Sequence, residues 1–224
     1  LDDWNLFFAV ANVNTIAANP NAPFKDFGQL LEAMRQRSNI AVATAGQSSA
    51  GRNVMEAVRA AAPGANYRMA PYDGGNPAVL AAVAGETPVV AQLLVEMAEM
   101  IRGKRLIPLA VQAEQPVMLQ GHGEIPSLRQ WLPDIPAPLN YFGIWCAKGT
   151  PDPVVQTVAQ VWRERIAASQ RLKDYAQQRA AVFTPLLLQE ARDKAWVAVR
   201  QTAWLYHDAG QSKAAPDTVG IPRL

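Results

Sequence analysis

Two short stretches of small and polar residues contain the groups best suited to recognise an anion. Residues 44–51 (Thr-Ala-Gly-Gln-Ser-Ser-Ala-Gly) follow the apolar run 40–43 and precede a helical pattern. Residues 71–77 (Pro-Tyr-Asp-Gly-Gly-Asn-Pro) follow another short apolar run. Loops of this composition can turn backbone N–H groups and hydroxyls toward one point, and a following helix adds the positive end of its dipole. The chemistry that these residues predict is binding of an anion by neutral donors.

The anion that fits these loops best is a carboxylate. The sequence has neither the Gly-x-x-x-x-Gly-Lys-Ser/Thr phosphate loop nor the Gly-x-Gly-x-x-Gly dinucleotide motif, which argues against a nucleotide phosphate. A simpler interpretation also stands. The glycines then only close a turn, and Ser48 or Ser49 only caps the helix that follows.

The loops must be positioned by strands and helices that alternate along the chain. The predicted strands are 14–18, 40–43, 66–70, 88–91, 106–111 and 140–147. The predicted helices begin at Asp26 and near residue 50, and continue at 78–84, 92–101, 153–168, 171–179 and 188–207. Residues 112–139 read as irregular and residues 211–224 as a loose tail. This alternation predicts an α/β fold with mostly parallel sheets, and both loops then lie at the carboxyl ends of strands, where ligands bind.

Composition narrows the class of protein. The chain has 224 residues, of which 50% are hydrophobic, so it can bury a large core. Its net charge of +2 comes from 21 basic and 19 acidic residues without a basic run, so no nucleic-acid partner is expected. No apolar segment approaches the ~20 residues needed to span a bilayer.

The remaining reactive side chains favour no metal and no catalysis. His122 and His207 are expected to lie in separate elements, and the only cysteine, Cys146, lies in an apolar strand without a nearby base in the sequence. No Gly-x-Ser-x-Gly elbow surrounds Ser48 or Ser49, which argues against a hydrolase. An α/β enzyme that uses Asp73 as a base remains an alternative, although it needs a second titratable partner.

Several motifs, taken in order, resemble one receptor family. They are Asn19-Pro20 before a helix, residues 44–51, residues 71–78, Leu80-Ala-Ala-Val-Ala-Gly85, residues 103–111, Phe142-Gly143 and Lys148-Gly-Thr-Pro151. Together they are similar to the extracytoplasmic solute receptors of tripartite tricarboxylate transporters, also called the Bordetella uptake gene family. Members usually begin with a further strand, glycine-rich loop and helix, so by this resemblance the chain is expected to be truncated at its N-terminus.

The resemblance implies a periplasmic binding protein of the type II-like, two-domain kind, with its first domain incomplete. Residues 20–138 would form the second domain, and residues 1–19 with 139–224 would supply the hinge strands and the rest of the first. Such a protein captures a di- or tricarboxylate or an aromatic carboxylate in the interdomain cleft and passes it to membrane permease subunits. It is expected to be a periplasmic monomer without catalysis or cofactor. A sensory receptor for organic acids is a further alternative.

The resemblance also assigns ligand-binding positions. The first loop supplies Thr44, Ala45, Gly46, Gln47, Ser48 and Ser49, and the second supplies Tyr72, Gly74, Gly75 and Asn76. A third position, often an aspartate in the family, falls on Gln92, and Tyr141 borders the cleft. The amide at residue 92 lowers the negative charge of this site relative to the family pattern. Glu96 and Glu99, three residues apart on a predicted helix, are expected to form a solvated face.

Overall fold

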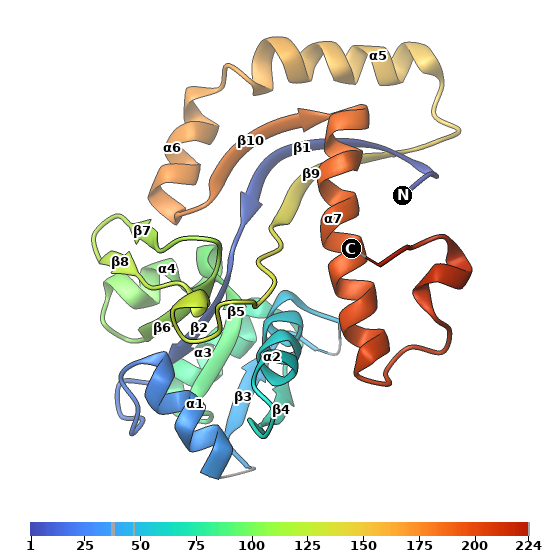
Figure 1. The fold of residues 1–224 in the computed structure, drawn as a ribbon. Helices are drawn as coiled ribbons and strands as arrows, with labels where there is room; N and C mark the ends of the chain where they lie inside the picture. Colours follow the sequence, from blue (N-terminus) through green and yellow to red (C-terminus); the bar gives the residue numbers. More distant parts are fainter. Residues whose placement is uncertain (37–38, 47, 224) are drawn as a thin grey trace.

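The computed structural model describes residues 1–36, 39–46 and 48–223, and it contains two larger β-sheets between which the chain crosses twice (Figure 1). The strands are β1 (Trp4–Asn12), β2 (Asn14–Ala18), β3 (Ala41–Thr44), β4 (Arg68–Pro71), β5 (Val89–Leu93), β6 (Ile107–Gln112), β7 (Val117–Leu119), β8 (Gly123–Ile125), β9 (Asn140–Ala147) and β10 (Val182–Leu187). The helices are α1 (Phe27–Gln36), α2 (Ala50–Ala61), α3 (Gly75–Ala84), α4 (Leu94–Arg102), α5 (Asp152–Val161), α6 (Gln170–Arg179) and α7 (Leu188–Asp208).

Strand direction in the larger sheet is mixed. Its order is β4-β3-β5-β2-β6, in which β3 pairs in parallel with β4 and β5, and β2 pairs antiparallel with β5 and β6. The smaller sheet, β10-β1-β9, is antiparallel throughout. The α/β class is confirmed. The pairing is mixed where mostly parallel sheets were expected. The reason is that β2 follows β1 directly from the other sheet, without the crossover helix that parallel neighbouring strands need.

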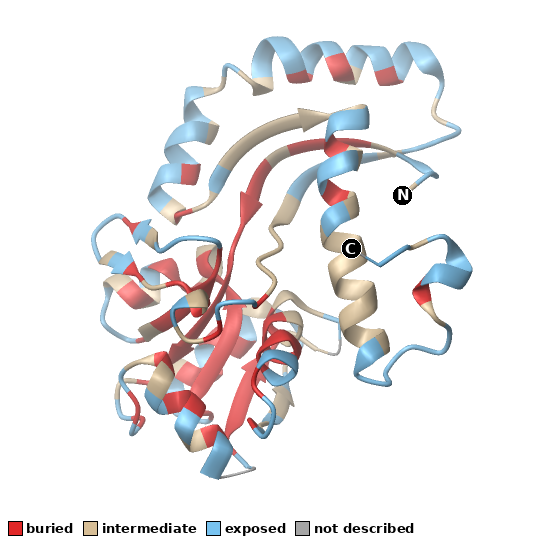
Figure 2. Cartoon of the chain, in the orientation of Figure 1, coloured by how far each residue is buried: buried red, intermediate tan, exposed pale blue. Residues whose placement is uncertain are grey.

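The larger sheet carries the main core, with a hydrophobic cluster on each face. One cluster joins α1 and α2 to the sheet, and the other joins α3 and α4 to it. Every residue of β2, β3 and β5 is buried between these layers (Figure 2). Strands that are buried on both faces read as short continuous apolar runs, which is the pattern that predicted them.

The smaller sheet is covered on both faces at its central strand only. Leu6 and Phe8 face α7, and between them Phe7 packs against α5 and Trp162. The Trp162 Nε1 donates a hydrogen bond of 2.7 Å to the Phe8 carbonyl. By contrast, the outer strand β9 has a largely exposed surface, as Figure 2 shows.

Buried side-chain amides hold together the two points at which the chain crosses between the sheets. The Asn14 Nδ2 donates to the Gln112 Oε1 at 2.7 Å, and the Asn140 Nδ2 donates to the Asn14 Oδ1 at 2.8 Å. The Gln112 Nε2 donates to the Pro136 carbonyl at 2.6 Å. The division into two domains stays a prediction; sheet membership places β2 with residues 20–138, although the expected boundary lies after residue 19.

Three segments have more order than the sequence predicted. The stretch 112–139 contains the β7–β8 hairpin, and the residues before α7 form the edge strand β10. The expected loose tail instead packs against α7, where the Trp204 Nε1 donates to the Ile221 carbonyl at 3.0 Å. Prolines hid the first two segments from sequence reasoning. Pro116 and Pro126 flank the hairpin, and Pro185 interrupts the apolar pattern of β10. A proline is tolerated in β10 because it is an edge strand.

Candidate ligand-binding site

The two predicted loops lie side by side at one edge of the larger sheet. β3 and β4 are parallel neighbours that end at Thr44 and Pro71, so the loops start from the same edge. The Tyr72 N–H donates a hydrogen bond of 2.8 Å to the Thr44 carbonyl, which joins one loop to the other. The expected meeting of these two backbone segments is therefore present in the structure. Gln47 lies outside the described residues.

The first loop leads into α2, whose start is fixed by three contacts. Ser49 is the N-cap, and its Oγ accepts from the Arg52 N–H at 3.2 Å, as the simpler interpretation of this loop requires. The Gly51 N–H donates to the buried Gln92 Oε1 at 3.2 Å. A side chain at Gly51 would overlap the carbonyl oxygen of Ala91, so only glycine lets the helix lie this close to β5.

The second loop leads into α3, whose start lies against the same glutamine. Gly74 has a φ of 111°, which favours glycine. A Cβ on Gly75 would lie 2.6 Å from the Gln92 Nε2 and would overlap the Glu96 carboxylate. Gln92 therefore lies between the N-terminal turns of α2 and α3, at the place where the sequence predicted a third ligand-binding position.

Glu96 is half-buried beside the start of α3, which corrects the expectation of a solvated face. Its Oε2 is buried and, among the described residues, has no hydrogen-bond partner. Desolvation raises the pKa of this carboxyl, and a hydrogen bond from the Leu93 backbone partly offsets the increase. Only Glu99 is exposed as expected, and it forms ion pairs with Arg102 and Arg179. The period of the helix could not reveal this difference, because the neighbour of Glu96 is Gly75, the first residue of another helix, α3.

The two tyrosines among the predicted site residues are placed differently. The Tyr72 hydroxyl donates to the Glu86 Oε2 at 3.1 Å, so its side chain is directed to the residue after the C-cap of α3. Tyr141 stacks on Phe8 with ring centroids 4.8 Å apart and an interplanar angle of 15°. Burial raises the pKa of the Tyr141 hydroxyl above its ordinary value of 10, so this group stays a neutral donor.

A cavity of about 440 Å³ lies beside Gln92, between the larger sheet and α7. The larger sheet and α2 contribute Ala50, Gln92 and Leu93. The smaller sheet contributes Phe8, Asn140, Tyr141, Phe142 and Trp145, and α7 contributes Ala195, Ala198 and Val199. The volume is within the range of small-molecule sites, roughly 300–1,000 Å³, and such sites occur preferentially between domains.

Only part of the predicted site lines this cavity. Gln92 and Tyr141 do, and Ala50, the residue after Ser49, brings the start of α2 to it. The described residues of the two loops, Thr44, Ala45, Gly46, Ser48, Ser49, Tyr72, Gly74, Gly75 and Asn76, are not in its lining. Sequence reasoning missed the α7 wall. Its signal is a set of small apolar residues at 195, 198 and 199, which is the spacing of one helix face.

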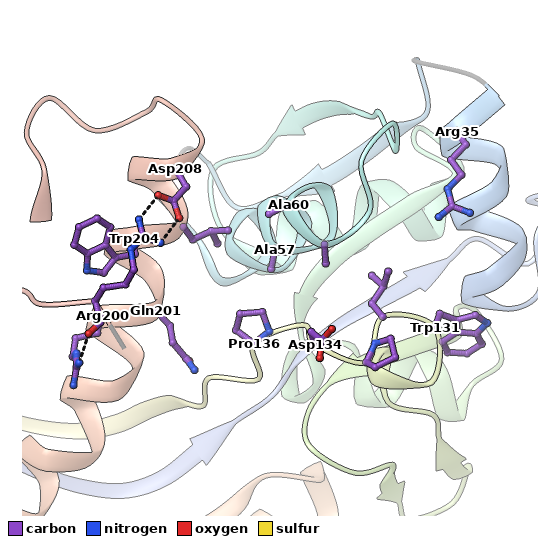
Figure 3. A pocket seen from close by; sticks show the side chains of 15 residues that line it. Arg35, Ala57, Ala60, Trp131, Asp134, Pro136, Arg200, Gln201, Trp204 and Asp208 are labelled. Carbon is purple, nitrogen blue, oxygen red and sulfur yellow. Dashed lines mark hydrogen bonds and ion pairs between the residues drawn. The ribbon is translucent and has the colours of Figure 1, made fainter.

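A larger cavity of about 670 Å³ lies farther along α2, between that helix, the loop of Trp131 to Pro136, and α7 (Figure 3). Its charged groups are largely engaged with one another and with the C-terminal tail. Arg223 forms two hydrogen bonds of 2.9 and 2.7 Å to Asp208 and lies over the Trp204 ring at 4.0 Å. Arg200 donates to the carbonyls of Pro222 and Arg223. None of the predicted site residues lines this cavity, so we take the smaller one as the candidate site.

Other classes of site find little support in the described part of the chain. No group of three or more His, Cys, Asp or Glu residues in it could hold a metal ion. Asp73 is exposed and, within residues 1–36, 39–46 and 48–223, forms no ion pair that could supply the second titratable partner. None of the helices described is both long enough and apolar enough to cross a membrane.

The two larger sheets are joined by two crossing segments, and the candidate cavity lies between them, as is common for small-molecule sites. The chain belongs to the tripartite tricarboxylate transporter family of receptors, because the model of that family matches residues 5–185. The resemblance noted in the sequence is thereby confirmed. No curated protein matches the sequence.

Solved structures of periplasmic and related binding proteins share the fold. The periplasmic binding protein BugD has a TM-score of 0.75 and 19% identity over 98% of this chain and 70% of its own. R. palustris Rpa4515, whose structure contains adipate, has a TM-score of 0.74 and 16% identity over 99% of this chain and 70% of its own. MatC from Rhodopseudomonas palustris, with bound malate, has a TM-score of 0.75 and 17% identity over 90% of this chain and 69% of its own. These matches confirm the mixed α/β fold of periplasmic binding proteins.

Proposed function

We propose that the protein is a periplasmic solute receptor that binds a small organic acid in the cavity beside Gln92 and delivers it to the permease subunits of a tripartite tricarboxylate transporter. The observation that carries the proposal is the convergence of the α2 start, Gln92 and Tyr141 on one cavity between the two sheets. Family membership and the adipate and malate in two structures of the same fold support it.

The recognition mechanism uses neutral donors. At the start of α2, the Gly51 and Arg52 N–H groups already donate to the Gln92 Oε1 and the Ser49 Oγ. Among the described groups, this leaves the Ala50 N–H and the positive end of the helix dipole for the acid. Each hydrogen bond to a charged acceptor contributes about 1.5–3 kcal/mol, so a carboxylate can bind here without a lysine or arginine. The Tyr141 hydroxyl, which forms no hydrogen bond with another described residue, is a further donor on the opposite side.

Closure of the two units around the acid would make the bound state distinct from the empty one. Ala50 and Gln92 come from one unit, whereas Tyr141 and the α7 wall come from the other. A ligand shifts such an equilibrium only through contacts that it makes better in the closed state. The permease would then recognise the closed surface. In this proposal the protein binds its ligand without converting it.

Calorimetric titration of the 224-residue chain with adipate, malate, hexanoate and benzoate tests the proposal. The matched variants are Ala50→Glu and Ala60→Glu, which add the same carboxylate to one helix. Ala50 lines the smaller cavity, whereas Ala60 is exposed and lines the larger one. We expect Ala50→Glu to weaken binding at least tenfold and Ala60→Glu to change it less than twofold, with thermal unfolding of both followed to confirm that they fold.

The reverse pattern would assign the acid to the larger cavity and overturn the site. Absence of binding by every acid in a chain that unfolds cooperatively would overturn the proposed function itself.

A further inference from the structure

The walls of the candidate cavity differ in chemistry from one side to the other. On the side of the larger sheet, Gln92 and the first turn of α2 supply polar groups. On the opposite side, the lining side chains are mainly the apolar ones of Phe142, Trp145, Ala195 and Val199, and Tyr141 adds a hydroxyl there. None of the described residues that line the cavity is Asp, Glu, Lys, Arg or His. The cavity therefore offers polar recognition at one end and an apolar surface for the rest of the ligand.

Two of the lining polar groups are already engaged. The Asn140 Nδ2 donates to the Asn14 Oδ1 at 2.8 Å and to the Asn12 carbonyl at 3.3 Å. The Gln92 Oε1 accepts from Gly51. The Gly51 and Arg52 N–H groups are engaged as well, which leaves, among the described groups, the Ala50 N–H and the α2 dipole for one carboxylate near α2, while the Tyr141 hydroxyl lies on the opposite side. A second carboxylate on the same ligand would face the α7 wall, whose lining side chains, Ala195, Ala198 and Val199, carry neither a cation nor a hydroxyl.

Burial of an unpaired carboxylate against apolar side chains is strongly unfavourable. A methylene or ring carbon at the same position is favourable, at about 0.8 kcal/mol for each buried CH₂, which corresponds to about fourfold in affinity. The two effects act in the same direction, because they make the same wall reject a charge and accept a hydrocarbon. Discrimination between acids therefore depends on the end of the bound acid that lies farther from α2.

We infer that this site, if the proposed function holds, selects acids with one carboxylate and an apolar chain or ring over compact di- and tricarboxylates. The apolar lining of the cavity and the absence of a charged side chain from that lining carry the inference. Adipate and malate, which are present in two structures of the same fold, are both dicarboxylates, so the acid inferred for this chain is of a different kind.

Calorimetry with hexanoate and adipate tests the inference, since the two acids have the same six-carbon chain and differ only in the second carboxylate. We expect hexanoate to bind at least tenfold more tightly than adipate. In the series butanoate, pentanoate and hexanoate we expect an increase of about fourfold for each added methylene. Equal or tighter binding of adipate would overturn the inference and leave the proposed function intact, whereas binding of neither class would overturn both.

A matched pair of variants on α7 gives an independent measurement. Val199 lines the cavity, whereas Val197, on the same helix, is 44% exposed and does not. Val199→Arg supplies the missing cation, so we expect the ratio of adipate to hexanoate affinity to rise at least tenfold. We expect Val197→Arg to leave the ratio within twofold. An unchanged ratio in a folded Val199→Arg variant would show that this wall does not meet the far end of the acid and would overturn the inference.

Discussion

The two sheets of this protein have similar hydrophobic sequences but very different surroundings. In the larger sheet, helices cover both faces and three strands are buried along their whole length. In the smaller sheet, β1 alone is well covered, while β9 leaves Phe142, Ile144 and Trp145 between 45% and 50% exposed. The comparison teaches that an apolar strand sequence shows only that a strand can be buried. Whether it is buried depends on the helices and strands that pack against it.

The largest effect is expected from a pair of phenylalanine truncations, one in each region. Phe27 is fully buried against Trp131, with ring centroids 5.5 Å apart, whereas Phe142 is 47% exposed on β9. Phe27→Ala should lower the free energy of unfolding by about 3–5 kcal/mol, and Phe142→Ala by less than about 1 kcal/mol. Urea denaturation measures both values. Similar losses would mean that β9 is buried in solution, and the contrast between the sheets would be lost.

A substitution at the helix–sheet contact tests how tightly the larger region is packed. Gly51→Ala places a methyl group on the Ala91 carbonyl and should cost roughly 1–3 kcal/mol or more, because α2 must move away from β5. The control is Gly149→Ala, at a glycine with open space around it, which we expect to change stability by less than about 1 kcal/mol. Thermal unfolding compares them, and a neutral Gly51→Ala would contradict the close approach.

Disruption of the amide network between the two regions should lower the free energy of unfolding slightly less than Gly51→Ala does. Asn14→Ala removes the partner of both Gln112 and Asn140. The loss should be about 1–3 kcal/mol, since buried amide groups are left without partners. The exposed Gln115→Ala is a control that changes an amide outside the network. Equal midpoints of denaturation for the two variants would show that the crossings are held by other contacts.

The smallest predicted effect concerns pH. Burial raises the pKa of Glu96 above 4.5, so the folded chain holds this proton more tightly than the unfolded chain does. Its contribution to stability is therefore present at low pH and is lost as pH rises from about 4.5 through the folded-state value. Glu96→Gln should flatten this part of the stability profile, whereas Glu99→Gln, on the exposed side of α4, should leave it. Melting temperatures from pH 4 to 8 would show the difference, and an unaltered slope in Glu96→Gln would contradict it.

Local signals in the sequence were sufficient for most elements of the larger region. The Asp26 side chain caps α1 by accepting from the Gln29 N–H at 2.8 Å, as predicted. The strand, loop and helix around residues 41–61 were also predicted, because an apolar run, a glycine-bearing loop and a helical period lie next to each other in the chain. In the smaller region β10 was missed, since Pro185 interrupts its pattern and its pairing partner β1 is more than 170 residues away.

The sequence by itself therefore determined the α/β class, the family and the two loops that meet at one sheet edge, because these depend on short-range patterns and on motif order. Only the tertiary structure decided which groups meet at the site. Gln92 contacts the starts of two helices from other parts of the chain, Glu96 is half-buried beside the start of α3, and α7 supplies the apolar wall. Such contacts depend on packing between distant segments, and a period of two or of 3.6 residues carries no information about the partner across the gap.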